Sequence, residues 1–163
     1  MAILYAKTKL GMDLPDLAAA NACDAGFDVR AAARVLLWPY SRTEIPLGFV
    51  YRFADETPII RDGVEYVQTL EVVKKGSGEP WLEPLAIIFD KGYHHALNDP
   101  RGIRLIVVNR SPWPHIIRRG RKVAQLVERE VRKVVVRPAT LEELEKIPRP
   151  DTRGGARLGS AGL

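Results

Sequence analysis

The residues whose types and spacing are best suited to binding a ligand lie between positions 153 and 162. The segment reads Arg-Gly-Gly-Ala-Arg-Leu-Gly-Ser-Ala-Gly, with four glycines, two arginines and one serine. Glycine lets backbone N–H groups approach a ligand, and successive N–H groups form concave anion sites. Arginine adds a bidentate fork that suits phosphate. The segment is therefore typical of a phosphate clamp, although glycine-rich composition is also typical of a frayed chain end.

The rest of the chain must position this segment, and its pattern predicts an all-β body. Short runs of β-forming residues alternate with Gly and Pro turns, as in sandwiches and barrels. The expected strands include residues 49–53, 65–73, 103–108, 123–127 and 131–136. A capping box from Thr140 to Glu143 predicts a short helix that ends near Lys146. Pro148 and Pro150 then predict a stiff, extended bridge to the glycine-rich segment.

We therefore expect one β domain over residues 1–139. Residues 140–163 would form the short helix, the proline-rich bridge and an extended C-terminal arm. A length of 163 residues suits a single domain with a real core.

Composition excludes several classes of function. A single cysteine, Cys23, excludes an internal disulfide framework and favours a reducing, cytoplasmic setting. Three histidines and that cysteine do not make a zinc site, and no apolar run reaches membrane-spanning length. The net charge of +5 is concentrated after residue 101. Because no basic stripe is interleaved with aromatic residues, a polyphosphate ligand is favoured over nucleic acid.

Three segments resemble, in order, motifs of the trimeric dUTPase (dUTP nucleotidohydrolase) family. The first is Leu14-Pro15 followed by Asp-Ala-Gly-Phe-Asp-Val at 24–29. The second is Ile-Arg-Arg-Gly-Arg-Lys-Val-Ala-Gln-Leu-Val at 117–127. The third is the arm at 153–162, which matches the family's glycine-rich motif without a gap. The resemblance covers both ends of the chain well and its middle poorly.

This resemblance implies a fold, an assembly and an activity. The fold would be the jelly-roll-like β-clip fold of dUTPases, in a homotrimer whose arms are exchanged between subunits. The activity would be hydrolysis of dUTP to dUMP and pyrophosphate with Mg²⁺. The arm would close over a deoxynucleoside triphosphate bound mostly by other subunits.

Carried onto the arm, the resemblance assigns phosphate binding to Arg153, Gly154, Gly159 and Ser160. Leu158 stands where the family has a base-stacking phenylalanine, and it lacks a ring to stack. The phosphate-binding half of the arm is thus retained, whereas the base-recognising half is altered. A different base or a weaker closure over the substrate is therefore plausible.

In the β body, the resemblance assigns Gln125 to the α-phosphate and Asp28 to the vicinity of Mg²⁺. Each residue also has a structural interpretation. Gln125 lies in an apolar run and could satisfy backbone groups, and Asp24 and Asp28 flank a glycine and could be Asx-turn residues.

The central motifs of the family are the part that this sequence does not match. The phosphate-binding Arg-Ser pair is missing, and its nearest substitute is the loop with Lys75 and Ser77. That loop could cradle phosphate, but it is equally typical of a solvated hairpin. A substitute for the water-activating aspartate is offered by Asp99, with Tyr93 in the sugar-stacking role; residues 98–102 could instead be only a turn. Asp90 or a residue within 55–85 is the other candidate acid.

Two other functions compete with hydrolysis of dUTP. A catalytically altered protein of this fold could bind a nucleotide or a regulatory partner without turnover. A dCTP deaminase is disfavoured, because Val107 occupies the position at which that sister family has a glutamate.

Overall fold

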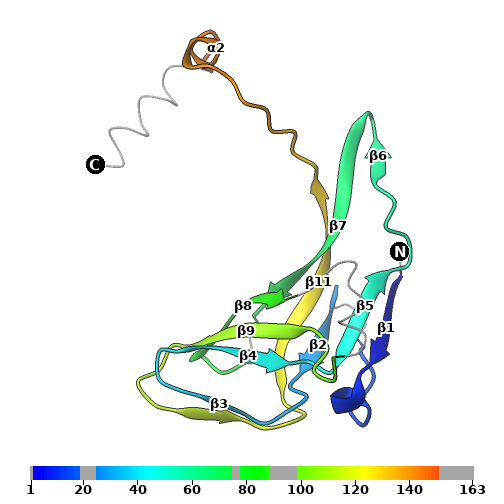
Figure 1. Ribbon diagram of the computed structural model, residues 1–163, viewed down its shortest axis with the longest axis vertical. Helices are drawn as coiled ribbons and strands as arrows, with labels where there is room; N and C mark the ends of the chain where they lie inside the picture. The colour runs from blue at the N-terminus through cyan, green and yellow to red at the C-terminus, as the bar shows by residue number, and fades with distance from the viewer. Residues whose placement is uncertain (1, 19–24, 75–77, 89–98, 151–163) are drawn as a thin grey trace. The chain divides into compact units, whose positions relative to one another are not determined.

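The computed structural model describes residues 2–18, 25–74, 78–88 and 99–150. This part of the chain contains eleven β-strands, a 3₁₀ helix η1 and a short α-helix α2 (Figure 1). The elements are β1 (Ile3–Lys7), η1 (Lys9–Gly11), β2 (Gly26–Arg30), β3 (Val35–Leu37), β4 (Arg42–Pro46), β5 (Phe49–Phe53), β6 (Ile59–Arg61), β7 (Val64–Val73), β8 (Leu82–Ile88), β9 (Arg104–Asn109), β10 (His115–Ile117), β11 (Lys122–Arg132) and α2 (Leu141–Glu145). The predicted all-β class with a short helix near its C-terminal end is confirmed.

The strands form antiparallel sheets that pair segments far apart in the sequence. One sheet has the order β2-β11-β7-β6 and a second has the order β4-β9-β8. Two further pairs, β1 with β5 and β10 with β3, complete the β body. Because each pairing is antiparallel, one face of each strand can be buried while the other faces water.

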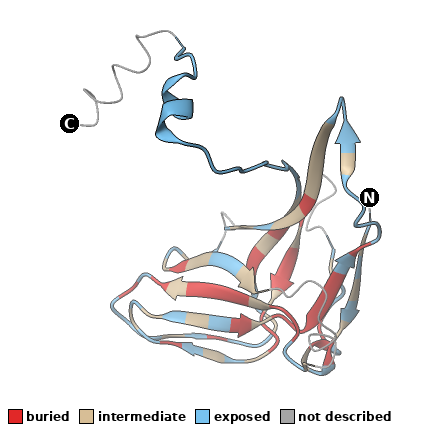
Figure 2. Cartoon of the chain, turned by 45° about the horizontal axis from the view of Figure 1, so that its top comes forward, coloured by how far each residue is buried: buried red, intermediate tan, exposed pale blue. Residues whose placement is uncertain are grey.

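A single hydrophobic core is supplied by all of these sheets, as Figure 2 shows in red. Alternating strand residues point inward, and the residues that are completely buried include Leu37 on β3, Ile45 on β4, Leu105 on β9, Ile117 on β10 and Leu126 on β11. Phe49 packs edge-on against both Tyr5 and Phe27 and so joins β5 to β1 and β2. The core therefore sets the relative positions of β2 and β11, which carry Asp28 and Gln125, and of β9, which follows the turn with Asp99.

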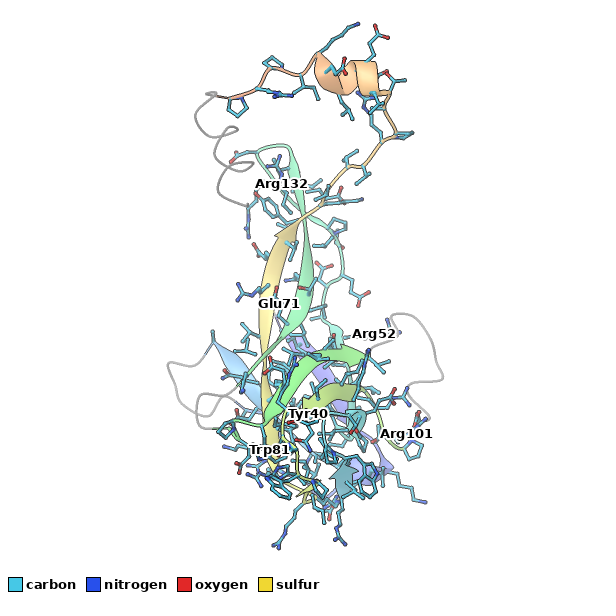
Figure 3. All side chains as sticks on the ribbon, turned by 90° about the vertical axis from the view of Figure 1, so that its left-hand side faces the viewer. Tyr40, Arg52, Glu71, Trp81, Arg101 and Arg132 are labelled. Atoms are coloured by element: carbon cyan, nitrogen blue, oxygen red, sulfur yellow. The ribbon has the colours of Figure 1, made fainter. Side chains whose placement is uncertain are left out.

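The strand β11 is longer than the sequence pattern predicts. The two expected strands at 123–127 and 131–136 are instead one strand that ends at Arg132. Its register with β7 runs from Gln125 opposite Val73 to Arg132 opposite Tyr66, so the long partner keeps it continuous. Figure 3 shows Glu71 and Arg132 along this ribbon. Charged pairs across β6, β7 and β11, such as Arg61 with Glu130, hold its exposed part.

The described contacts divide the chain into two units, Met1–Lys133 and Val134–Leu163. In the second unit, the predicted helix cap is present, because the Glu143 amide donates a hydrogen bond to Oγ1 of Thr140 at 3.2 Å. Apolar residues in this unit are highly exposed, including Val135, Val136 and Leu141. A domain boundary after residue 139 stays a prediction.

Candidate functional site

Two of the predicted site residues are neighbours across a strand pair. Asp28 on β2 lies directly opposite Gln125 on β11, and Val73 on β7 lies opposite Gln125 on the other side. Directly opposed residues of an antiparallel pair project from the same face, with Cβ atoms about 4.5–5.5 Å apart. The register therefore places the candidate metal-binding carboxylate and the candidate α-phosphate ligand side by side.

The glycine of the first motif explains how β2 can approach β11 so closely. A Cβ atom on Gly26 would lie 2.4 Å from the carbonyl oxygen of Leu126 and 2.8 Å from Cγ2 of Val127. Any side chain at this position would push β2 away from β11. Gly26 therefore acts through the strand pairing that aligns Asp28 with Gln125, and needs no contact with a ligand.

Asp28 has a cationic neighbour at the start of β11. Its Oδ2 lies 3.0 Å from Nζ of Lys122, and its side chain is only 7% exposed. A nearly buried carboxylate is stable in its charged form only when it is paired or hydrogen-bonded. Lys122 is thus a charge partner that an incoming cation would have to share or displace.

The first motif also lines a small cavity, to which Asp28 contributes. The segment with Leu14 and Pro15 reaches Asp28 there, and Lys7 secures the segment by donating from Nζ to the Leu14 carbonyl at 2.6 Å. The cavity volume is about 20 Å³, which is little more than one water molecule needs. This cavity therefore reflects the packing of the motif and is too small for a nucleotide.

A larger, cationic pocket lies between the β7–β8 connection and the start of β11. It has a volume of about 220 Å³ and is lined by Lys74, Gly78, Glu79, Leu82, Arg121, Lys122 and Val123. Each cation has a carboxylate partner: Lys74 lies 3.5 Å from Glu83, and Arg121 binds Glu79. Such exposed pairs are weak, so an anion with several charges could compete for the cations. The pocket can accommodate a phosphate chain.

Sequence reasoning did not single out Arg121 and Lys122. The signal was present, because both follow the Gly120 turn and precede Gln125 on the same strand. Gly120 has a φ of +87° and hydrogen-bonds its amide to the Ala31 carbonyl at 2.7 Å. The turn therefore fixes both basic residues at the edge of the pocket, and the second of them, Lys122, also contacts Asp28.

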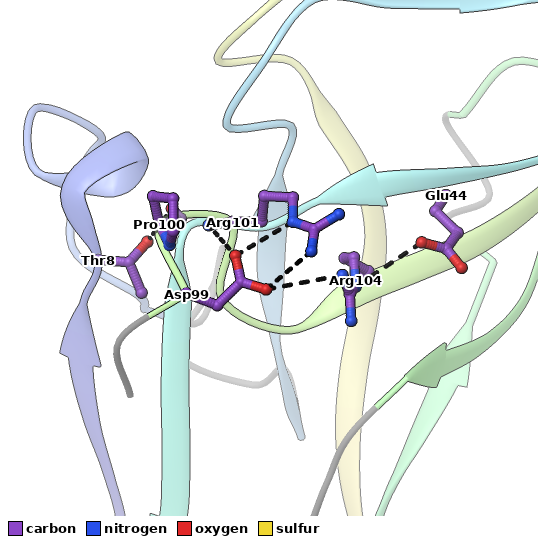
Figure 4. A network of polar contacts seen from close by, with 6 residues as sticks. All are labelled: Thr8, Glu44, Asp99, Pro100, Arg101 and Arg104. Atoms are coloured by element: carbon purple, nitrogen blue, oxygen red, sulfur yellow. Dashed lines mark hydrogen bonds and ion pairs between the residues drawn. The ribbon is translucent and has the colours of Figure 1, made fainter. Parts of the chain in front are cut away.

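Asp99 is held by arginines in the turn that precedes β9 (Figure 4). Its Oδ1 accepts from the Arg101 amide at 2.9 Å and from Nε at 3.1 Å, and its Oδ2 accepts from Nη2 at 3.0 Å. Nη1 of Arg104 lies 3.7 Å from the same Oδ2. Hydrogen bonds from Arg101, above all, hold the pKa of Asp99 below its usual range. A carboxylate so stabilised is a weak proton acceptor while these contacts last.

The Asp99 turn is anchored to the β body through its backbone. Oγ1 of Thr8 donates to the Pro100 carbonyl at 2.7 Å. Gly102 has a φ of +67°, and a Cβ there would lie 2.3 Å from the Phe49 carbonyl oxygen. No contact recorded among the described residues joins Asp99 to Gln125. The two groups of candidate residues are therefore separate clusters in one chain.

Several predicted residues lie outside the described part of the chain. These are Lys75 and Ser77 in the β7–β8 connection, Tyr93 before the Asp99 turn, and Arg153, Gly154, Leu158, Gly159 and Ser160 in the arm. Their assignments stay predictions. The described neighbours of Lys75 and Ser77, however, are Lys74 and Gly78, and both line the cationic pocket.

Within residues that the structure describes, no group of three His, Cys, Asp or Glu side chains could hold a metal ion. Asp28 is the carboxylate that the register places at the candidate site. Mg²⁺ commonly binds through one or two carboxylates together with substrate phosphates. The donor set therefore suits a magnesium ion that arrives with a polyphosphate. Among the described helices, none is long and apolar enough to cross a membrane.

Comparisons with solved structures identify the class of the fold. The dUTPase of phage phi11 of S. aureus, in a structure showing its species-specific insert, has a TM-score of 0.58 at 18% identity over 90% of this chain and 100% of that chain. A phi11 variant described for the coordination of a structural Mg(II) ion has the same TM-score and identity, covering 89% and 99% of the two chains. Staphylococcus bacteriophage 80alpha dUTPase with dUpNHpp has a TM-score of 0.59 at 18% identity, with coverages of 90% and 92%. The chain therefore has the dUTPase fold.

Sequence comparison agrees with this fold. The deoxyuridine 5'-triphosphate nucleotidohydrolase of Sinorhizobium medicae (strain WSM419) is 28% identical over 158 residues, covering 94% of this chain and 85% of that protein. No family model matches the chain. The chain is therefore similar to this dUTPase over most of both sequences, and it has the dUTPase fold.

Proposed function

We propose that this protein hydrolyses dUTP to dUMP and pyrophosphate in the presence of Mg²⁺. The observation that carries the proposal is the strand register that sets Asp28 beside Gln125, next to the cationic pocket. The similarity to the S. medicae dUTPase over most of both chains supports the same reaction.

The chemistry requires a water molecule to attack the α-phosphorus. A bond forms between the water oxygen and the α-phosphorus, the bond from that phosphorus to the bridging oxygen breaks, and pyrophosphate leaves. Bound Mg²⁺ would neutralise phosphate charge. On this chain, Gln125 would donate from its side-chain amide to the α-phosphate, and Asp28 would be the nearest carboxylate to the metal. Lys122 and Arg121 would offset charge on the phosphate chain.

Asp99 is our candidate for the group that orients the water and accepts its proton. Its contacts in the isolated chain occupy both carboxylate oxygens, and Arg101 supplies most of them. A triphosphate carries more negative charge than a carboxylate and also accepts bidentate hydrogen bonds from a guanidinium. Binding of substrate would therefore draw the Arg101 side chain away and free Asp99 to accept a hydrogen bond from water.

The remaining assignments concern the parts of the site that the described residues do not include. Arg153, Gly154, Gly159 and Ser160 would close over the β- and γ-phosphates, and Lys75 and Ser77 would extend the cationic pocket. Tyr93 and Leu158 would contact the sugar and the base.

We also propose that the active unit is a homotrimer that exchanges C-terminal arms. Five exposed apolar side chains near the C-terminal end favour this assembly, because burial under another chain would remove their apolar surface from water. They are Val134, Val135, Val136, Leu141 and Ile147. Asp99 and Gln125 lie in separate clusters of one chain, which also fits a site assembled from several subunits.

The direct test is pyrophosphate release from dUTP, dCTP, dTTP, dATP and dGTP with Mg²⁺. We expect dUTP to be the preferred substrate, and Asp99→Asn to lower kcat by at least about 100-fold with little change in dUTP binding. No turnover of any of the five at high enzyme concentration would refute the proposal. Tight dUTP binding by calorimetry without turnover would instead select the non-hydrolytic alternative, for which the arginine-bound state of Asp99 is the favouring observation.

A further inference from the structure

The outer face of the β3–β10 ribbon carries exposed apolar and aromatic side chains. Leu36 lies opposite Ile116 in the register, and both are exposed. Their neighbours in the core-facing positions, Leu37 and Ile117, are completely buried. Because strand side chains alternate between the two faces, Trp38 projects from the same outer face as Leu36. The indole of Trp38 is 62% exposed.

The same alternation places arginines at the other end of this face. Arg34 precedes Leu36 by two residues, and Arg118 follows Ile116 by two residues; both are exposed. Extension of the register by one pair sets Arg34 opposite Arg118. Like charges that lie directly opposite each other destabilise a strand pair. This end of the ribbon therefore favours a ligand that carries negative charge.

No acidic residue occurs in the two segments that build this face, residues 29–43 and 100–127. Exposed arginines extend the positive charge at their edges, with Arg42 at the start of β4 and Arg110 after β9. Within the described part of the chain, Arg34, Arg42, Arg110 and Arg118 have no recorded ion-pair partner. Other arginines of these segments do, as Arg119 with Asp13 shows.

Two further aromatic side chains lie where β3 and β10 meet their connecting turns. Tyr40 is 68% exposed and Trp113 is 69% exposed. The buried Asn109 fixes the backbone that carries the indoles, because its Nδ2 donates to the carbonyls of Trp38 at 3.2 Å and Trp113 at 2.8 Å. A single side chain from the core thus holds both tryptophan segments. Figure 3 shows Tyr40 in the β body, where this ribbon lies.

We propose that this face binds single-stranded nucleic acid. Proteins that bind single strands combine aromatic surfaces, on which bases stack, with arginines that track the phosphates. Trp38, Tyr40 and Trp113 offer the stacking surfaces, and Arg34 and Arg118 offer the phosphate contacts. The uniform negative charge of a nucleic-acid strand suits two segments that contain arginines and no acidic residue better than a protein partner of mixed charge does. The face belongs to different strands from Asp28 and Gln125, so the inference does not depend on the proposed hydrolysis.

The test is fluorescence anisotropy of a labelled dT20 oligonucleotide with the full-length protein, at several salt concentrations. Trp38→Ala should weaken binding by roughly 5- to 100-fold, because base–aromatic stacking contributes that much per base. The double variant Arg34→Gln/Arg118→Gln should reduce the slope of log K against log[salt] by about 1.4, since each phosphate contact on a single strand contributes about 0.7. The matched control Arg52→Gln/Arg129→Gln removes the same charge from other exposed positions and should leave the slope nearly unchanged.

Three comparisons decide between this ligand and its rivals. An oligonucleotide of the same length with abasic sites should bind more weakly than dT20; equal binding would show a face that recognises charge alone and overturn the proposal. If poly-glutamate binds with the same affinity as dT20, the face binds acidic polypeptides equally well and the proposal is overturned. If Trp38→Ala changes the oligomeric state by light scattering, the face is a subunit interface and the proposal fails. Unchanged thermal unfolding and dUTP hydrolysis would show that the variants are folded.

Discussion

Nζ of Lys122 lies 3.0 Å from Oδ2 of Asp28, a carboxylate whose side chain is only 7% exposed. The pair joins the cationic pocket to the strand register that aligns Asp28 with Gln125. Asp28 is nearly buried and Lys122 is partly exposed. Removing the lysine therefore leaves a buried charge behind, whereas removing the aspartate does not.

Removal of the lysine alone should destabilise the protein. Lys122→Ala withdraws a charge partner from the buried carboxylate, and we expect a loss of about 1–3 kcal/mol in the free energy of unfolding. Lys122→Ala/Asp28→Asn should recover much of this loss, because the second substitution removes the buried charge. Urea unfolding of the wild type, both single variants and the double variant measures the coupling. Strictly additive effects would show that the ion pair has no energetic role.

The cationic pocket predicts a specific loss of substrate binding. Arg121 and Arg129 lie near opposite ends of β11, and each forms an exposed ion pair with a glutamate. Only Arg121 lines the pocket. Arg121→Gln should raise the KM for dUTP by roughly 10-fold or more, as expected when a hydrogen bond to a charged group is lost. Steady-state kinetics of Arg129→Gln provide the matched control, and an equal effect in both variants would contradict a role for the pocket.

The contacts between Asp99 and Arg101 should make a pH-dependent contribution to the free energy of unfolding. Arg101 lowers the pKa of Asp99 in the folded protein. The stabilisation is therefore complete above the pKa of the unfolded chain, near 3.9, and is lost as the pH falls through the lower folded value. Asp99→Asn should be less stable than the wild type at pH 7, and the difference should shrink at pH 3.

Thermal unfolding at the two pH values measures this effect. Asp62→Asn, at the exposed β6–β7 turn, is the control because Asp62 has no ion pair recorded among the described residues. A stability difference for Asp99→Asn that is the same at pH 7 and pH 3 would contradict the role of the arginine pair.

The pairing of β2 with β11 should require a glycine at position 26 for steric reasons alone. Gly26→Ala brings a Cβ to 2.4 Å from a backbone oxygen of β11, and overpacking of this kind commonly costs about 1–3 kcal/mol. Gly63→Ala is the comparison, because Gly63 has a φ of +76° but a Cβ added there would meet no atom within 4 Å; it should cost about 1–2 kcal/mol from backbone strain alone. Hydrolysis of dUTP should fall for Gly26→Ala alone, since only that substitution disturbs the alignment of Asp28 with Gln125.

Much of the architecture could be read from local patterns. A short apolar run between two sets of turn residues identified the strand at 103–108, because both signals are local properties of the sequence. The helix that begins after Thr140 followed from a cap that involves only neighbouring residues. The motifs with Asp28 and Gln125 also pointed to the dUTPase family before any contact was known.

Other features depend on pairings between distant segments, which local patterns do not specify. The register of β2 with β11 decides that Asp28 faces Gln125, and the long pairing with β7 makes β11 one strand. In the linear sequence, Arg34 and Trp38 are far from Arg118; pairing of β3 with β10 brings the three residues onto one face. The sequence alone thus determined the types of residue and their local conformation. Only the tertiary structure decided which side chains meet, because the free energy of strand pairing comes from contacts between segments far apart in the chain.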